Sequence, residues 1–202
     1  KRTSKIFIEK KLSLNIQMIE GRRVTDDQMI DVVTMVYAGL LNKKIVAALQ
    51  SDDCDALGLS GVDANLILSE KRPLQGGIDY GWVGDPLFVN TARISSFIDL
   101  GLVPVLAPIT HEGQGNLLNT NADTIASKLA IGMSNIYETS IYYCFELNGV
   151  LRDLKDKSSV IKQINSKAYK TLLEGGIIAD GMLPKLENCF EALKSGAFKV
   201  YM

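Results

Sequence analysis

A near-continuous apolar run, LVPVLAPI at residues 102–109, constrains the fold more than any other feature of the sequence. A strand with no polar face is typical of a parallel sheet that is covered on both sides. Two further apolar strand patterns occur at residues 55–61 and 140–145, with helix-period segments between them. Strands that alternate with helices favour an α/β fold with a mainly parallel sheet and helices on both of its faces.

Apolar residues recur at helical spacing in three segments, residues 30–41, 121–137 and 185–195. Thr25 and Gln28 have capping-box spacing, so we expect the first of these helices to begin there. Residues 65–69 and 80–89 alternate loosely and predict a hairpin or a small antiparallel pair. The chain has no internal repeat and no clear linker, which favours a single domain over residues 1–202.

The composition indicates an ordinary globular protein. The 202 residues are 47% hydrophobic and 22% charged, and the formal net charge is -1. Such a balance disfavours nucleic acid and acidic membranes as partners, and we expect no apolar run long enough to cross a bilayer. Cys54, Cys144 and Cys189 are far apart in sequence, which predicts reduced thiols, no metal site and a cytoplasmic location.

Polar side chains follow the strand pattern that precedes residue 121. Asn119, Asn121 and Asp123 belong to the segment LNTNADTIAS. Ligands of α/β sheets bind at the carboxyl ends of strands, so these residues are candidates for a polar ligand site. Asn121 is equally suited to be a helix N-cap, and Asp123 suits the first turn of a helix. Asn119 lies too far upstream to cap the same helix.

Two cationic residues are placed where anions bind. Lys185 lies in the first turn of the last predicted helix, next to free backbone N–H groups. Arg23, in the segment GRRVTD, lies just ahead of the first predicted helix, and arginine is suited to bidentate binding of a carboxylate. Each residue could equally be a solvated surface side chain. Together with the polar segment they indicate a site for a small polyanion.

Several motifs resemble the acetylglutamate kinases of the amino acid kinase family, and most closely a Bacteroidetes-like bacterial branch. The resemblance covers nearly the whole chain and rests on GRRVTD, LGLSG, YGWVGDP, GLVPVLAPI, NGVLRD and, most specifically, NTNADTIA and GMLPKL. It implies a three-layer αβα sandwich with an acylglutamate-binding and dimerisation part at about residues 1–137 and an ATP-binding part at about 138–202. It also implies that the amino-terminal strands and the end of the carboxy-terminal part lie outside this chain.

The implied reaction is the transfer of the γ-phosphate of ATP to the γ-carboxylate of N-acetyl-L-glutamate, in arginine biosynthesis. By resemblance, Lys185 and Asp123 are catalytic, and Arg23, Asn119 and Asn121 bind the acylglutamate. The implied adenine-nucleotide contacts are Glu146, Leu147, Asn148, Gly149, Val150, Leu151, Ile177, Ile178 and Ala179. The cofactor is ATP with Mg²⁺, which the ATP phosphates mainly hold, and the family default is a homodimer.

The chain departs from the family in two respects. The glycine-rich loops that the family places ahead of Lys1, with a further catalytic lysine, are absent, so we expect sequence beyond both ends. Glu146 stands where the family has an aspartate. Alternatives are the same reaction on N-succinylglutamate, a non-catalytic effector-binding domain of the same fold, and a kinase for aspartate, carbamate or a nucleotide. A nicotinamide dehydrogenase is disfavoured because no GxGxxG follows a strand.

Overall fold

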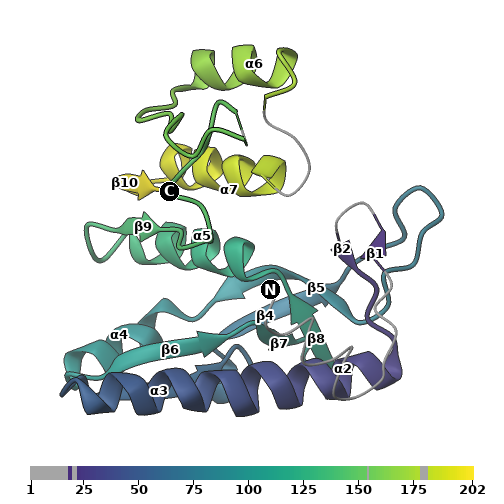
Figure 1. Ribbon diagram of the computed structural model, residues 1–202. Helices are drawn as coiled ribbons and strands as arrows, with labels where there is room; N and C mark the ends of the chain where they lie inside the picture. The colour runs from purple at the N-terminus through teal and green to yellow at the C-terminus, as the bar shows by residue number, and fades with distance from the viewer. Residues whose placement is uncertain (1–17, 20–21, 154, 178–181) are drawn as a thin grey trace. The chain divides into compact units, whose positions relative to one another are not determined.

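The computed structural model describes residues 18–19, 22–153, 155–177 and 182–202. The chain divides into two compact units, Lys1–Ile125 and Ala126–Met202, which we call unit 1 and unit 2 (Figure 1). The boundary between the two units falls inside helix α5 (Ala122–Met133).

Unit 1 contains a mixture of short strands and helices. Its elements ahead of α5 are β1 (Met18–Ile19), β2 (Arg22–Arg23), α2 (Asp27–Thr34), the π-helix η1 (Met35–Leu41), α3 (Asn42–Ser51), β3 (Ala56–Ser60), the 3₁₀ turn η2 (Asp63–Asn65), β4 (Ile67–Lys71), β5 (Val83–Val89), α4 (Thr91–Asp99), β6 (Val103–Ala107), β7 (Ile109–His111) and β8 (Leu117–Thr120).

Besides the short β1–β2 pair, two sheets organise the described part of unit 1. Strands β3 and β6 are parallel, with Ala56 opposite Val103 and Ser60 opposite Ala107. Strands β4, β5, β8 and β7 close into a small barrel. The antiparallel β4–β5 pair confirms the predicted hairpin. The apolar run at residues 102–109 forms β6 and the start of β7, but it is not covered on both faces in the described structure, because Val103 is exposed.

The helix of residues 27–51 packs on this unit through one face. Met29, Val33 and Val36 lie in a core cluster with Ile109 of β7. The predicted capping box is wrong: Asp26 is the N-cap, and its Oδ1 accepts a hydrogen bond of 2.8 Å from the backbone N–H of Met29. The hydroxyl of the preceding threonine instead accepts a hydrogen bond from a side chain of β8.

The expectation that no segment could cross a bilayer is wrong by length and composition, because the helical run Asp27–Ser51 passes that test. A core helix of a soluble protein passes the same test. Here Asn42, in the middle of the run, is buried, and its Nδ2 donates to the backbone carbonyls of Leu59 and Val105 at 3.3 and 2.7 Å. We therefore interpret the run as a helix that packs on unit 1 through one face.

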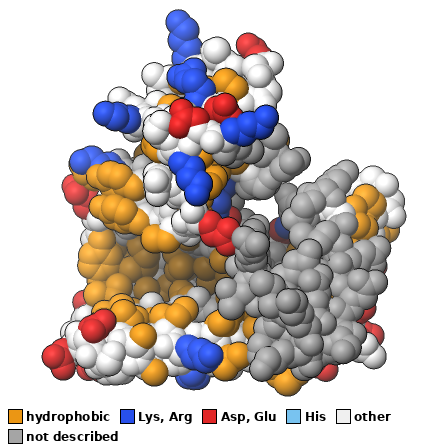
Figure 2. Space-filling view, viewed as in Figure 1, with side chains coloured by type: hydrophobic (Ala, Val, Ile, Leu, Met, Phe, Trp, Pro, Cys, Tyr) orange, Lys and Arg blue, Asp and Glu red, His pale blue; other side chains and the backbone are white. Residues whose placement is uncertain are grey.

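Unit 2 is built around a parallel pair of strands, β9 (Ser140–Tyr142) and β10 (Lys199–Tyr201). Helices α6 (Ser166–Glu174) and α7 (Met182–Lys194) follow β9 in the chain, and Asn165 caps α6 through its side chain. Basic and acidic side chains are interspersed over the α6 and α7 region on the face shown in Figure 2. Among the described side chains on that face, no patch of a single charge dominates.

Candidate active site

Three segments that are far apart in sequence meet in unit 1. The first contact joins residue 25 to the turn that precedes β5. The backbone N–H of Thr25 donates to the Tyr80 carbonyl at 2.9 Å, and the N–H of Trp82 donates to the Thr25 carbonyl at 2.7 Å. Gly81 lies between them with a φ of +71°, and a Cβ there would lie 2.2 Å from the Thr25 carbonyl oxygen. Only glycine permits this close approach.

Asn119 completes the junction from β8. Its backbone N–H donates to the Trp82 carbonyl at 2.8 Å, and its Nδ2 donates to Thr25 Oγ1 at 3.0 Å. Thr25 is fully buried, so its hydroxyl is fixed by its surroundings. Two of the motifs that were predicted to bind substrate, GRRVTD and NTNADTIA, are thereby joined through a third, YGWVGDP.

The tryptophan of this third motif has a second link to the same region. Its Nε1 donates to Asp27 Oδ1, in the first turn of α2, at 2.6 Å. The ammonium of Lys71 lies 4.6 Å from the centre of the Trp82 ring. Sequence reasoning gave Thr25 and Trp82 no role in the site. Gly81 was the usable signal, since a glycine between two aromatic residues can mark a close backbone approach.

The structure describes the backbone of Arg23 but not its side chain. Arg23 lies in β2, opposite Met18 of β1 in an antiparallel pair, two residues before Thr25. Its side chain lies outside the described part of the structure, so its role in carboxylate binding stays a prediction.

Asn121 has the structural role that its sequence position also suggested. Its Oδ1 accepts hydrogen bonds from the backbone N–H groups of Asp123 at 2.8 Å and Thr124 at 3.4 Å. The N-cap interpretation is confirmed. Asp123 is half-buried in the first turn of α5, where a carboxylate is favoured by the helix dipole. Ligand contacts of these two residues stay predictions.

Lys185 lies in the first two turns of α7, in unit 2, and is half-buried. Its Nζ lies 5.2 Å from the centre of the Tyr143 ring and 5.9 Å from that of Phe145. Sequence reasoning did not connect these aromatic residues with the lysine. They follow β9, so the lysine lies beside the carboxyl end of a parallel strand, where ligands of such sheets bind.

The predicted nucleotide contacts differ in exposure. Glu146 and Asn148 lie nearer the surface, whereas Val150 and Leu151 are buried. Val150 packs in a cluster with Leu172 and Leu186, and Ile177 packs against the same cluster. The buried side chains therefore support the unit, and surface groups or backbone atoms are the ones a nucleotide could reach. The predicted contacts Ile178 and Ala179 lie outside the described residues.

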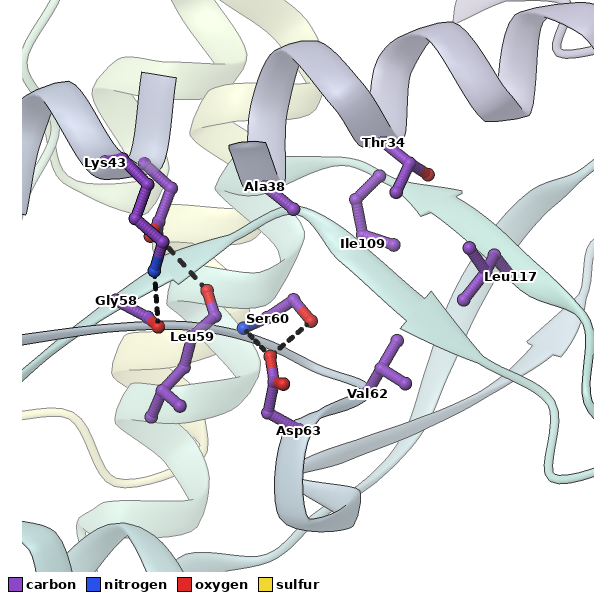
Figure 3. Close-up of a pocket in the computed structure, with 11 residues that line it drawn as sticks. Thr34, Ala38, Lys43, Gly58, Leu59, Ser60, Val62, Asp63, Ile109 and Leu117 are labelled. Atoms are coloured by element: carbon purple, nitrogen blue, oxygen red, sulfur yellow. Dashed lines mark hydrogen bonds between the residues drawn. The ribbon is translucent and has the colours of Figure 1, made fainter. Parts of the chain in front are cut away.

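Unit 1 contains a hollow of about 360 Å³ that is lined by η1, α3, β3 and β7 (Figure 3). The Nζ of Lys43 donates to the Gly58 carbonyl at 3.1 Å, and the Asp63 carboxylate accepts from the Ser60 N–H and hydroxyl at 2.6 and 2.7 Å. These contacts are internal to the wall of the hollow. None of the predicted site residues that the structure describes line it.

No cluster of three or more His, Cys, Asp or Glu side chains that could hold a metal occurs among the residues that the structure describes. Among the predicted site residues that the structure describes, Asp123 has a carboxylate in the first turn of a helix. A Mg²⁺ ion bound to nucleotide phosphates needs only one or two protein carboxylates, so a single aspartate is compatible with it.

Comparison with known proteins defines the class. The model of the amino acid kinase family matches residues 3–202, so the chain belongs to that family. Its curated relatives include the acetylglutamate kinases of Cytophaga hutchinsonii and Bacteroides fragilis. Each is 51% identical to it over 96% of this chain, which spans 73% and 74% of their respective lengths. The acetylglutamate kinase of Methanocella arvoryzae is 34% identical over 96% of this chain and 66% of its own.

Solved structures agree on the fold. The structure of smu.665 from Streptococcus mutans has a TM-score of 0.84 at 22% identity, and covers 98% of this chain and 77% of that one. N-acetylglutamate synthase from Neisseria gonorrhoeae, in complex with coenzyme A and N-acetylglutamate, has a TM-score of 0.80 at 18% identity, with 98% and 45% coverage. The predicted α/β amino acid kinase fold and the predicted Bacteroidetes-like resemblance are confirmed.

Proposed function

We propose that this chain is the kinase that transfers the γ-phosphate of ATP to the γ-carboxylate of N-acetyl-L-glutamate, which yields N-acetylglutamyl 5-phosphate for arginine biosynthesis. The observation that carries the proposal is the 51% identity to two acetylglutamate kinases over 96% of this chain. The hydrogen-bonded junction of the GRRVTD, YGWVGDP and NTNADTIA motifs in unit 1 supports it, because these segments bear the predicted substrate residues.

The substrate side of the reaction requires recognition of a small dianion. Arg23 binds the α-carboxylate through its guanidinium, which is the side chain suited to bidentate pairing with a carboxylate. Asn119 bonds the acylated amino acid through its carboxamide, and its Nδ2 contact with Thr25 holds that group in one orientation. A fixed carboxamide discriminates between ligands because a mismatched donor or acceptor stays unpaired.

The chemical step needs no general base, because a carboxylate is already ionised at neutral pH. The difficulty is to bring two anions together, so positioning and charge neutralisation supply the rate. The Lys185 ammonium offsets negative charge on the transferring phosphoryl group and on the ADP that leaves. Asp123 orients the cationic groups. Mg²⁺, which the ATP phosphates would mainly hold, would supply further neutralisation of phosphate charge.

The proposed nucleotide contacts are residues 146–151 and 177–179, of which Glu146 and Asn148 lie at the surface. We further propose a cytoplasmic homodimer that has neither nucleic acid nor a membrane as a partner. The near-neutral net charge of -1 supports the absence of a nucleic-acid partner.

The test is an ATP-dependent hydroxamate assay on the full-length protein, in which hydroxylamine traps the acyl phosphate. N-acetylglutamate, N-succinylglutamate and aspartate are compared in parallel, and Lys185→Ala serves as the inactive control. We expect the largest kcat/KM with N-acetylglutamate. A preference for N-succinylglutamate would reassign the acyl group, and nucleotide binding without product from any of the three would indicate an effector-binding domain.

A further inference from the structure

Two aromatic rings flank the ammonium of Lys185. The Nζ lies 5.2 Å from the ring centre of Tyr143 and 5.9 Å from that of Phe145. Both distances fall within the range of about 6 Å over which a ring face attracts a cation. Tyr143 is buried and Phe145 is half-buried, so solvent competes only partly for the lysine.

The extended segment that follows β9 explains why Tyr143 and Phe145 both face the lysine. Tyr143 continues the β9–β10 pairing, since its N–H donates to the Tyr201 carbonyl at 2.9 Å. Tyr143 and Phe145 pack on the same core cluster, which includes Cys189 of α7. Residues two apart in an extended segment point to the same side. Tyr142, the last residue of β9, is exposed and stacks on Tyr201 with ring centres 4.4 Å apart.

The helix explains why the lysine meets these rings. Lys185 lies four residues before Cys189, so the two side chains share one face of α7, the face that packs on the aromatic segment. A cation near a helix N-terminus is disfavoured by the helix dipole. The electron-rich ring faces oppose that effect and also restrict a long side chain that otherwise samples many rotamers.

A ring face holds an ammonium without adding negative charge, which a carboxylate partner would do. The two ring contacts therefore restrict the lysine without adding negative charge beside it. We propose that Tyr143 and Phe145 are positioning residues that hold the Lys185 ammonium ready for phosphoryl transfer. This inference rests on the proposed kinase function and on the role of Lys185 in it.

The experiment removes one ring and keeps the packing. Phe145→Leu is the test variant, because Phe145 is only half-buried and leucine fills part of its volume. Phe145→Tyr retains a ring and is the rescue variant. Tyr142→Leu is the matched control. It removes an exposed ring close to Tyr143 in the chain, but this ring stacks on Tyr201 and has no recorded contact with the lysine.

The first readout is independent of activity. In the full-length protein with ¹³C-labelled lysine, the Cε–Hε signal of Lys185, assigned by its loss in Lys185→Arg, should be shifted upfield by the rings. We expect this shift to shrink in Phe145→Leu and to persist in Phe145→Tyr and Tyr142→Leu. An unshifted signal in the parent protein would overturn the proposal even if Phe145→Leu does not fold.

The second readout is kinetic. Phe145→Leu should lower kcat about 3- to 10-fold, with the KM values of both substrates within about twofold, because the ring acts on a group that works in the transition state. Phe145→Tyr and Tyr142→Leu should retain the parent kcat. An unchanged kcat in Phe145→Leu, while Lys185→Ala is inactive, overturns this inference alone. Full activity in Lys185→Ala refutes instead the role that the proposed function gives the lysine.

Discussion

The substitution Gly81→Ala tests the junction between residue 25 and the turn before β5. A Cβ at this position would lie 2.2 Å from the Thr25 carbonyl oxygen and 2.8 Å from its carbonyl carbon, and both belong to the backbone. Neither atom can rotate away as the end of a side chain could. Alanine therefore has to push the Thr25 segment off the turn, which breaks the hydrogen bonds to Tyr80 and Trp82.

The magnitude has two parts. The positive φ of +71° costs alanine about 1–2 kcal/mol, whatever surrounds it. The clash adds about 1–3 kcal/mol more, the usual cost of forcing extra atoms into a packed site. The control Gly101→Ala carries the first cost alone, because Gly101 has a φ of +80° and nothing within 4 Å of its Cβ position.

The assay is thermal unfolding of the two variants together with their kinetics. At about 2–4 °C per kcal/mol for a chain of this size, Gly81→Ala should unfold several degrees below Gly101→Ala. Its KM for the acylglutamate should rise more than its KM for ATP, because Asn119 and the segment that bears Arg23 are joined to this turn. Equal Tm values for the two alanine variants would refute the reasoning.

Four further outcomes are expected. Lys185→Ala should lower kcat about 100-fold or more, with a smaller change in KM, and near-normal turnover would remove it from the site. Arg23→Ala should raise the KM for the acylglutamate about 10- to 100-fold and leave that for ATP unchanged, as steady-state kinetics will show. Asn42→Leu should destabilise the fold by about 1–3 kcal/mol in denaturant unfolding, since two strand carbonyls lose their donor. Burial, with a smaller effect of Glu187, raises the pKa of Tyr169 in the folded protein. The neutral phenol therefore stabilises the fold at lower pH, and this stabilisation is lost as the pH rises through the raised pKa. Tyr169→Phe should reduce the loss of stability at alkaline pH, as unfolding measured across pH will show.

Local patterns predicted the parts of the fold that depend on local physics. The apolar run at residues 102–109 became β6 and the start of β7, and the loosely alternating segments became the β4–β5 pair. Asn121 caps α5, as its position before an apolar-periodic helix indicated. In each case the residue type acts on neighbours within a few positions, so the sequence alone contains the information.

Contacts between distant segments could not be predicted in this way. Thr25 has a suitable side chain and spacing for a cap, yet Asp26 takes that role, because the Thr25 hydroxyl is buried against Asn119. The aromatic neighbours of Lys185 lie some forty positions earlier in the chain, at residues 143 and 145. Val150 packs in an apolar cluster with Leu172 and Leu186, which its sequence neighbourhood did not indicate. Each outcome depends on which segments meet, and one sequence does not state that.

The orientation of α3 relative to α2 depends on the number of residues in the π-helical segment η1 between them. The Asn42 N–H bonds the Tyr37 carbonyl, five residues back, so η1 carries a wider turn than an α-helix. If the same residues of Met35–Leu41 wound as an ordinary α-helix, α3 would rotate by about 100° relative to α2, because the wider turn takes up one extra residue. The carboxamide of Asn42 would then leave the carbonyls of β3 and β6. A homologue with an ordinary α-helix in this region should therefore be one residue shorter across Met35–Leu41 and keep the asparagine on the same face.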